Sequence, residues 1–163
     1  GFERVGLGLV HQGRQGAGAW FSGPIALSGA IAHGASILAA RAMGADFAYI
    51  GSAFIAAAEA NATDEYKQMI LASEGSDIVY TDLFSGIPGN YLGGAIARAG
   101  YDPKNLPPRI GALDVDSGIK AWRDIWAAGQ GVGVVQRVES TADMVARWSR
   151  EYEAARASLG QSR

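Results

Sequence analysis

The stretch PIALSGAIAHGASILAARAMGADFAYIGSAF, residues 24–54, contains one pattern twice. Each copy is a short apolar run that ends in a serine and a glycine, at Ser28–Gly29 and at Gly51–Ser52. Between the runs, small and apolar residues predict a helix from Gly34 to Met43. Gly44 then suits the left-handed conformation that commonly ends a helix. A strand, a helix and a strand in so few residues predict a parallel βαβ unit.

The two apolar runs, Ile25–Leu27 and Asp46–Ile50, are expected to be strands of a parallel sheet. Strands of such sheets are covered by helices or other strands on both sides and therefore read as continuous apolar runs. We expect the first of these strands, Ile25–Leu27, to be buried on both faces.

The two glycine turns predict an anion site. A helix N-terminus exposes free backbone N–H groups and carries a partial positive charge, so it binds phosphate without Lys or Arg. The loops after strands seven and eight of (β/α)8 barrels frequently bind phosphate in this way. Glycine lets the phosphate approach the N–H groups, and Ser28 and Ser52 add hydroxyl donors. The alternative is that Gly29 and Gly51 are ordinary turn glycines.

Further elements are expected downstream. A helix over residues 61–74 is predicted, with Asn61 or Thr63 as its cap. A third extended run, Ile78–Thr81, precedes a loop that includes Gly89, and Lys120–Trp126 reads as a helix. The clearest helix is Ser140–Leu159, whose apolar face is expected to contain Met144, Val145, Trp148 and Tyr152.

Composition excludes several classes of protein. The net charge of this 163-residue chain is −2, and its 14 Lys and Arg residues are scattered, so a nucleic-acid partner is not expected. The chain has no cysteine, which excludes disulfides and thiolate metal sites, and no metal site is expected. Residues 15–40 carry no charged side chain, but their glycines, serines, Pro24 and His33 argue against a membrane span. A soluble cytoplasmic protein is expected.

Five pieces of the sequence, in this order, resemble the FMN-dependent nitronate monooxygenases: GPIALSGAIAHG, GADFAYIGSAFIA, EANATDEYKQMI, DIVYTDLFSGIPGNYL and KAWRDIWAAGQGVG. The resemblance runs from Phe21 to Leu159 and implies the C-terminal half of such a protein. The implied fold is α/β, with strands 7 and 8 of a (β/α)8 TIM barrel and a smaller, mainly helical covering domain. Residues 21–58 would be the barrel unit, 59–118 the covering segment and 119–163 the C-terminal helices.

The resemblance also implies the site residues. Ser28, Gly29 and Ala30 match the turn after strand seven, and Tyr49, Ile50, Gly51 and Ser52 match the turn after strand eight. Together they would hold the FMN phosphate. The family often has two glycines at the first turn, where this chain has Gly29–Ala30. Gln130 is a further candidate for a hydrogen bond near the flavin, although a tight turn would explain its glycine neighbours equally well.

In such enzymes the flavin takes electrons from an alkyl nitronate and passes them to O2, which yields a carbonyl compound and nitrite. The family's usual histidine stands in a GGH motif, which is absent here; His11 lies at a suitable distance, but its neighbours differ. Residues 1–20 are therefore expected to be an unmatched leader, disordered or misread. We expect an incomplete, inactive fragment of the enzyme. A homo-oligomer is one option for its assembly. The alternatives are an FMN-dependent NAD(P)H:quinone or enoyl reductase and a non-enzymatic remnant.

Overall fold

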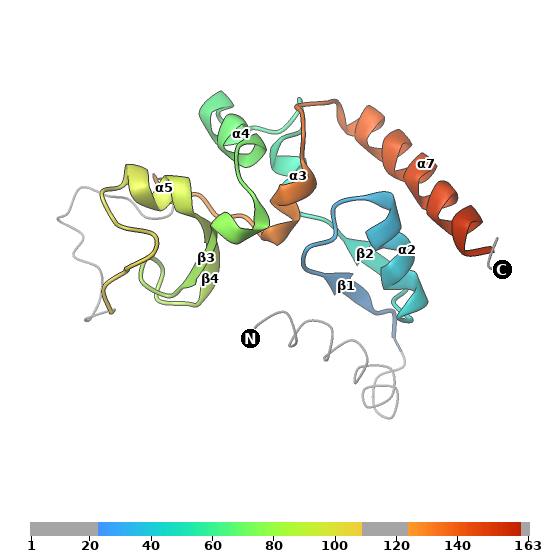
Figure 1. Cartoon of the computed structure of the whole chain (residues 1–163), viewed down its shortest axis with the longest axis horizontal. Helices are drawn as coiled ribbons and strands as arrows, with labels where there is room; N and C mark the ends of the chain where they lie inside the picture. Colours follow the sequence, from blue (N-terminus) through green and yellow to red (C-terminus); the bar gives the residue numbers. More distant parts are fainter. Residues whose placement is uncertain (1–22, 109–123, 161–163) are drawn as a thin grey trace. The chain divides into compact units, whose positions relative to one another are not determined.

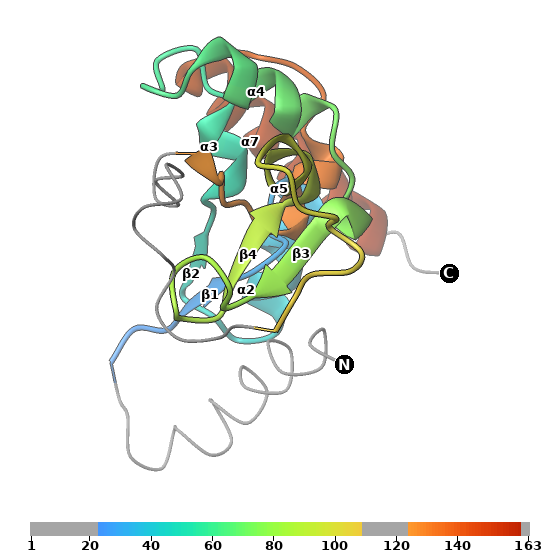
Figure 2. The ribbon, with the colours of Figure 1, turned by 90° about the vertical axis from the view of Figure 1, so that its left-hand side faces the viewer.

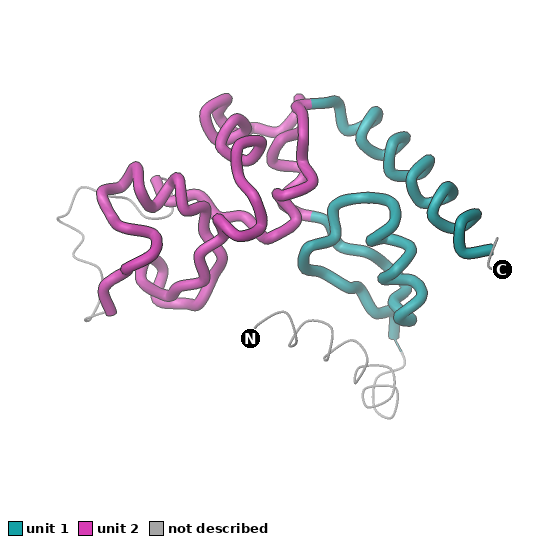
Figure 3. The backbone as a smooth tube through the Cα atoms, in the orientation of Figure 1, with its two compact units in different colours: residues 1–50, 139–163 teal, residues 51–138 magenta. Residues whose placement is uncertain are grey.

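The computed structural model describes residues 23–108 and 124–160. The chain divides into two compact units, shown in Figure 3. The first unit contains residues 1–50 and 139–163, and the second contains residues 51–138. His11 and Trp122 lie outside the described residues.

The first unit contains the predicted βαβ arrangement. Strand β1 (Ala26–Ser28) pairs in parallel with β2 (Phe47–Tyr49), and α2 (Gly34–Ala42) connects them, as Figure 1 shows. The C-terminus of α2 is closed by two hydrogen bonds, from Gly44 N to Arg41 O at 2.9 Å and from Ala45 N to Ala40 O at 3.1 Å. Gly44 has a φ of +91°, so its predicted role as the left-handed cap is confirmed.

Only one face of this sheet is covered. Leu27 is buried and packs in a cluster with Ala40 of α2, and Ala48 packs against that cluster. The opposite face carries Phe47 and Tyr49, which are 62% and 65% exposed. In β1 itself, Ala26 and Ser28 are exposed on either side of the buried Leu27, so the expectation that this strand is buried on both faces is wrong. The reason is that α2 covers one side only, and no described residue of the first unit covers the other.

Helix α7 (Thr141–Gly160) packs along α2 in the same unit (Figure 1). A Cβ on Gly34 would overlap backbone atoms of Trp148 and Tyr152, so the two helices meet at backbone distance. Trp148 is buried in this contact, as expected, but Val145 is half exposed, and its predicted place on the buried face is wrong. In the described part of the chain, α7 included, no helix is long and apolar enough to cross a membrane.

The second unit contains short elements around an antiparallel hairpin. Figure 2 shows its strands β3 (Ile78–Thr81) and β4 (Gly89–Leu92) side by side, with Thr81 paired to Gly89. Strand β3 is confirmed. Gly89, however, begins a strand rather than lying in a loop, because the turn from 82 to 88 reverses the chain and lets it pair with β3. The helical elements are α3 (Ser52–Ile55), α4 (Asp64–Leu71), η2 (Gly75–Asp77), α5 (Gly93–Arg98) and η4 (Gln130–Val134).

Trp126 is extended rather than helical. The described part of the predicted helix ends at Asp124, and the following backbone pairs with β4. Leu92 N donates to Trp126 O at 2.9 Å, and Ala128 N donates to Asn90 O at 3.2 Å. The predicted helix over Lys120–Trp126 therefore does not reach Trp126, because the backbone there pairs with a strand that is distant in sequence.

Candidate functional site

The first glycine turn adopts an unusual backbone. Gly29 has a φ of +98°, and Ala30 has a φ of +52°, the only positive φ of a non-glycine residue in the parts of the chain that the structure describes. A Cβ on Gly29 would meet nothing within 4 Å, so glycine is required there by the backbone and not by packing. Successive N–H groups in such turns form concave sites that bind anions. The turn therefore fits a phosphate group.

The parallel pairing brings the candidate residues of the two strands together. Ser28 stands opposite Tyr49 in the register of β1 and β2, so both strands end at the same edge of the sheet. Tyr49 is exposed on the uncovered face, and Ile50 is partly buried. Gly51 follows two residues after Tyr49 and begins the second unit.

Two further candidates meet inside the second unit. Ser52, the first residue of α3, accepts a hydrogen bond at its Oγ from Gly129 N at 2.8 Å. Gln130, the residue after Gly129, begins η4 and is exposed. The predicted turn at Gln130 and the predicted serine therefore lie beside each other, although 77 positions separate Ser52 from Gly129. The Ser52 hydroxyl still has its own hydrogen to donate.

The N-terminus of α2 is not an open anion site. Gly34 N, in the first turn, donates to Glu151 Oε2 of α7 at 2.8 Å. The cap residue is His33, whose Nδ1 accepts from Ser36 N at 3.3 Å. The expectation that this helix start offers its N–H groups to phosphate is therefore wrong, because a carboxylate of the same unit already occupies it. The N–H groups of Gly29 and Ala30 precede the helix and are the ones that fit a phosphate.

Glu151 is held as an anion by its surroundings. Burial alone raises the pKa of this carboxyl, but hydrogen bonds from Gly34 N and Arg147 and the charges of Arg147 and His33 outweigh it and lower the pKa below its ordinary value. Arg147 Nη1 lies 2.9 Å from Glu151 Oε1, and the same guanidinium also pairs with Glu139. The partial positive charge at the start of α2 is thus neutralised by Glu151. Arg147 holds Glu151 in place and also pairs with Glu139, two residues before α7.

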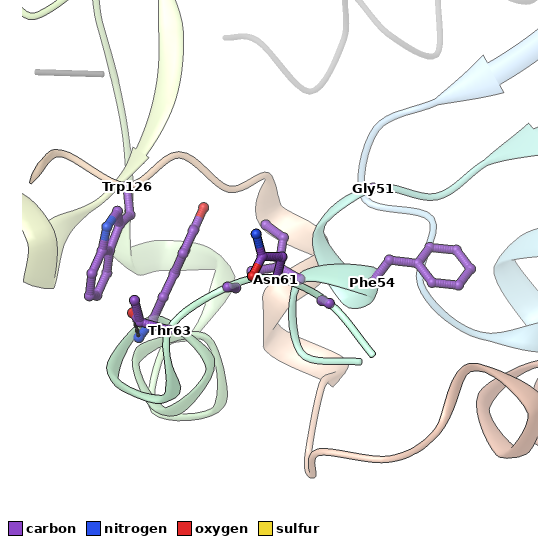
Figure 4. Close-up of a pocket in the computed structure, with 9 residues that line it drawn as sticks. Gly51, Phe54, Asn61, Thr63 and Trp126 are labelled. Atoms are coloured by element: carbon purple, nitrogen blue, oxygen red, sulfur yellow. Dashed lines mark hydrogen bonds between the residues drawn. The ribbon is translucent and has the colours of Figure 1, made fainter. Parts of the chain in front are cut away.

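A pocket of about 540 Å³ in the second unit includes Gly51. Figure 4 shows Trp126 and Thr63 on one side of this Gly51 pocket and Gly51 and Phe54 on the other, with Asn61 between them. Thr63, not Asn61, caps α4, since its Oγ1 accepts from Tyr66 N. Asn61 is exposed at the pocket and is free of that structural role.

Sequence reasoning missed Glu151 and Tyr66. Glu151 lies 117 positions after Gly34, so no local pattern connects the two residues. Tyr66 stacks on Trp126 with ring centroids 4.6 Å apart, and this pair too joins segments distant in sequence. Among the residues described, no group of three or more His, Asp or Glu side chains is placed to hold a metal ion.

The family model of nitronate monooxygenase matches residues 17–150 of this chain. The nitronate monooxygenase of Paraburkholderia phytofirmans is 30% identical over 95 residues, which are 58% of this chain and 26% of that protein. The probable nitronate monooxygenase of Staphylococcus haemolyticus is 26% identical over 114 residues, or 64% of this chain and 32% of the relative. The matched part thus spans about a third or less of these curated relatives.

Solved structures agree on the fold. A nitroalkane oxidase from Streptomyces ansochromogenes superposes with a TM-score of 0.73 at 26% identity, covering 94% of this chain and 45% of the other. The M276A mutant of FabK from Thermotoga maritima gives 0.71 at 23% identity, covering 94% and 48%. The expected fold class, part of a (β/α)8 barrel with a smaller domain, is confirmed. The chain belongs to the nitronate monooxygenase family of flavin-dependent oxidoreductases.

Proposed function

We propose that this chain is part of an FMN-dependent nitronate monooxygenase, which oxidises alkyl nitronates with O2 to a carbonyl compound and nitrite. The observation that supports the proposal is the tight turn at Gly29 and Ala30, two consecutive residues with positive φ at the end of a strand, in a chain of this family. FMN, when bound, would supply the transfer of electrons from nitronate to O2.

The chain's own residues would bind and orient the cofactor. The N–H groups of Gly29 and Ala30 would donate to the phosphate, and the Ser28 hydroxyl would add a donor from the end of β1. In the second unit, Ser52 would donate its hydroxyl while Gly129 N holds its oxygen at 2.8 Å. Tyr49, Ile50 and Gly51 connect these two groups of donors, and Gln130 would add an amide beside Ser52. His11 is kept as the candidate for proton transfer from the substrate.

We further propose that the remaining strands of the barrel are required for activity. The sheet of β1 and β2 is uncovered on one face, and the chain spans only about half of the solved structures that it matches. Residues 21–58 would complete the barrel, 59–118 would cover the flavin, and 119–163 would close the fold. The substrate would be a small nitronate, and the protein would be cytoplasmic; homo-oligomerisation stays open.

The test uses the full 163-residue chain alone and mixed with the N-terminal segment of the Paraburkholderia phytofirmans relative, which would supply the missing βα units. We expect the chain alone to retain no FMN after gel filtration. The mixture is expected to show a bound-flavin absorption spectrum and to release nitrite from ethyl nitronate. NADH-driven quinone reduction without nitrite release would instead support the reductase alternative.

A matched pair of variants separates the phosphate role from backbone strain. Gly29→Ala and Gly100→Ala both place a Cβ at a φ near +90° with nothing within 4 Å, so both introduce the same strain. We expect only Gly29→Ala to weaken FMN binding in the mixture, by tenfold or more. Equal FMN affinity in the two variants would contradict the phosphate assignment of this turn.

A further inference from the structure

The second unit contains another cavity of about 540 Å³, which shares Tyr66 and Trp126 with the Gly51 pocket. Tyr66 and Trp126 line both cavities, so the stack is their common wall. We call the second cavity the aromatic pocket, because four of its lining side chains carry aromatic rings. These rings belong to Tyr66, Phe84, Tyr91 and Trp126.

The common wall is held in place by ring stacking, a hydrogen bond and a cation over the Trp126 ring. The Tyr66 and Trp126 rings are 4.6 Å apart at an angle of 16°, and the Tyr66 hydroxyl donates to Ala127 O. The Arg98 guanidinium lies 3.7 Å from the centroid of the Trp126 ring and is itself paired with Glu65 at 2.7 Å. The wall is therefore organised before any ligand enters, which reduces the entropy lost on binding.

The facing wall is equally well fixed. Phe84 is 4% exposed and contacts Tyr91 edge to face, with centroids 5.5 Å apart and an interplanar angle of 75°. The Tyr91 hydroxyl donates to Ser85 Oγ at 2.9 Å. The aromatic pocket is thus lined mainly by rings, and its polar side-chain groups are the hydroxyls of Tyr66, Ser85 and Tyr91.

The chemistry of the lining defines the ligand. None of the seven lining residues is an acid, a base or a histidine. Burial also raises the pKa of Tyr66, which keeps its phenol neutral. An anionic group would gain nothing in this cavity, whereas a flat apolar group can pack against the ring edges that line it. The volume lies in the range of small-molecule sites, ~300–1,000 Å³.

We propose that the aromatic pocket binds an aryl substituent of the substrate, so that the enzyme prefers aryl nitronates to short alkyl nitronates. This inference rests on the proposed function for the identity of the reacting group. The Gly51 pocket, which begins at the second phosphate turn, and the aromatic pocket share one wall.

Binding can be measured on the full chain without flavin, by the chemical shifts of its backbone amides. The probes are the anion of phenylnitromethane and ethyl nitronate, under the same buffer conditions. The phenyl probe is expected to shift the amides of Ser85 and Ala127 and to bind at least tenfold more tightly than ethyl nitronate. Equal affinity for the two probes, or shifts confined to residues outside the pocket, would overturn the proposal.

Ala127→Phe fills the aromatic pocket from an exposed position and should weaken binding of the phenyl probe tenfold or more. Ala154→Phe makes the same change at an exposed position of α7 and should leave binding unchanged. Tyr91→Phe, which keeps the ring and removes the hydroxyl, should change the affinity less than twofold. Should Ala127→Phe not fold, the comparison of the two probes on the unchanged chain decides the question.

These outcomes are separate from the test of the proposed function. Tight binding of the phenyl probe without nitrite release from the assembled enzyme would contradict the proposed reaction and support the proposed binding site. Nitrite release without selective binding of the phenyl probe would support the proposed reaction and contradict the proposed binding site.

Discussion

Ala30 is a residue whose conformation conflicts with its side chain. Its φ of +52° places it in the left-handed region, where a Cβ costs roughly 1–2 kcal/mol. Strain of this kind persists only where the surrounding structure enforces it, and it clusters at ligand sites. The strand end before Ala30 and the buried Ile31 after it supply that constraint.

Replacing Ala30 with glycine should therefore stabilise the chain. The strain is removed, while glycine adds some entropy to the unfolded state, and the net gain is expected to be about 0.5–1 kcal/mol. The free energy of unfolding in urea, followed by circular dichroism, measures it. Ala39→Gly is the matched control, because Ala39 is exposed inside α2 and the same substitution should cost about 1 kcal/mol there. Destabilisation by Ala30→Gly would show that the turn is not strained.

At the scale of the element, α2 shows how a helix is closed at both ends. Its N-terminus has the reciprocal hydrogen bonds between His33 and Ser36, and its C-terminus ends at Gly44. The third contribution comes from α7, because Glu151 accepts the N–H of Gly34. A negative charge at a helix start is stabilising, so α7 contributes electrostatically as well as by packing.

This contact predicts a dependence of stability on pH. The pKa of Glu151 is lower in the folded chain than its ordinary value of 4.5, so its contribution is fully present above that value. The contribution is lost as the pH falls below about 4.5 and passes through the folded-state pKa, since protonation then occurs first in the unfolded chain. Glu151→Gln should reduce the free energy of unfolding at pH 7 by about 1 kcal/mol and flatten its fall in acid.

Urea unfolding at several pH values between 7 and 3 tests this expectation. Glu153→Gln on the same helix is the control, because Glu153 is exposed and pairs only with Arg156 three residues later. An exposed pair of this kind contributes little, and the control should keep the pH dependence of the unchanged chain. Identical pH profiles for the two variants would rule out a special contribution from Glu151.

At the scale of the whole molecule, the decisive feature is the uncovered face of the first sheet. In a (β/α)8 barrel the face opposite the helices points into a packed interior. Phe47 and Tyr49 lie on that face and are largely exposed, and parallel strands are normally buried on both sides. The rest of the barrel would bury them.

Phe47→Lys tests this role. In the chain alone the substitution should change the free energy of unfolding by less than about 0.5 kcal/mol, because the side chain is already exposed. In the mixture with the complementary barrel segment it should abolish FMN retention, since an unpaired charge would be buried. Val145→Lys, at a half-exposed position of α7, should leave FMN retention intact. FMN retention by both variants would show that the face stays open.

The local sequence by itself determined the βαβ unit, the left-handed cap at Gly44 and the glycine turn at Gly29. These features depend on apolar periodicity and on backbone conformations that only certain residues adopt easily, and both can be read within a few residues. The family resemblance could also be recognised from the sequence, because it depends on short motifs and their order along the chain. Neither requires the contacts of the folded protein.

Tertiary structure alone decided which groups are available at the site. Glu151 occupies the start of α2 from 117 positions away, and pairing with β4 makes Trp126 extended and sets it against Tyr66. The same limit explains why the exposure of Phe47 was not foreseen: an apolar strand reads alike whether or not its second face is covered. Contacts between distant segments depend on how the chain packs, and no local pattern records them.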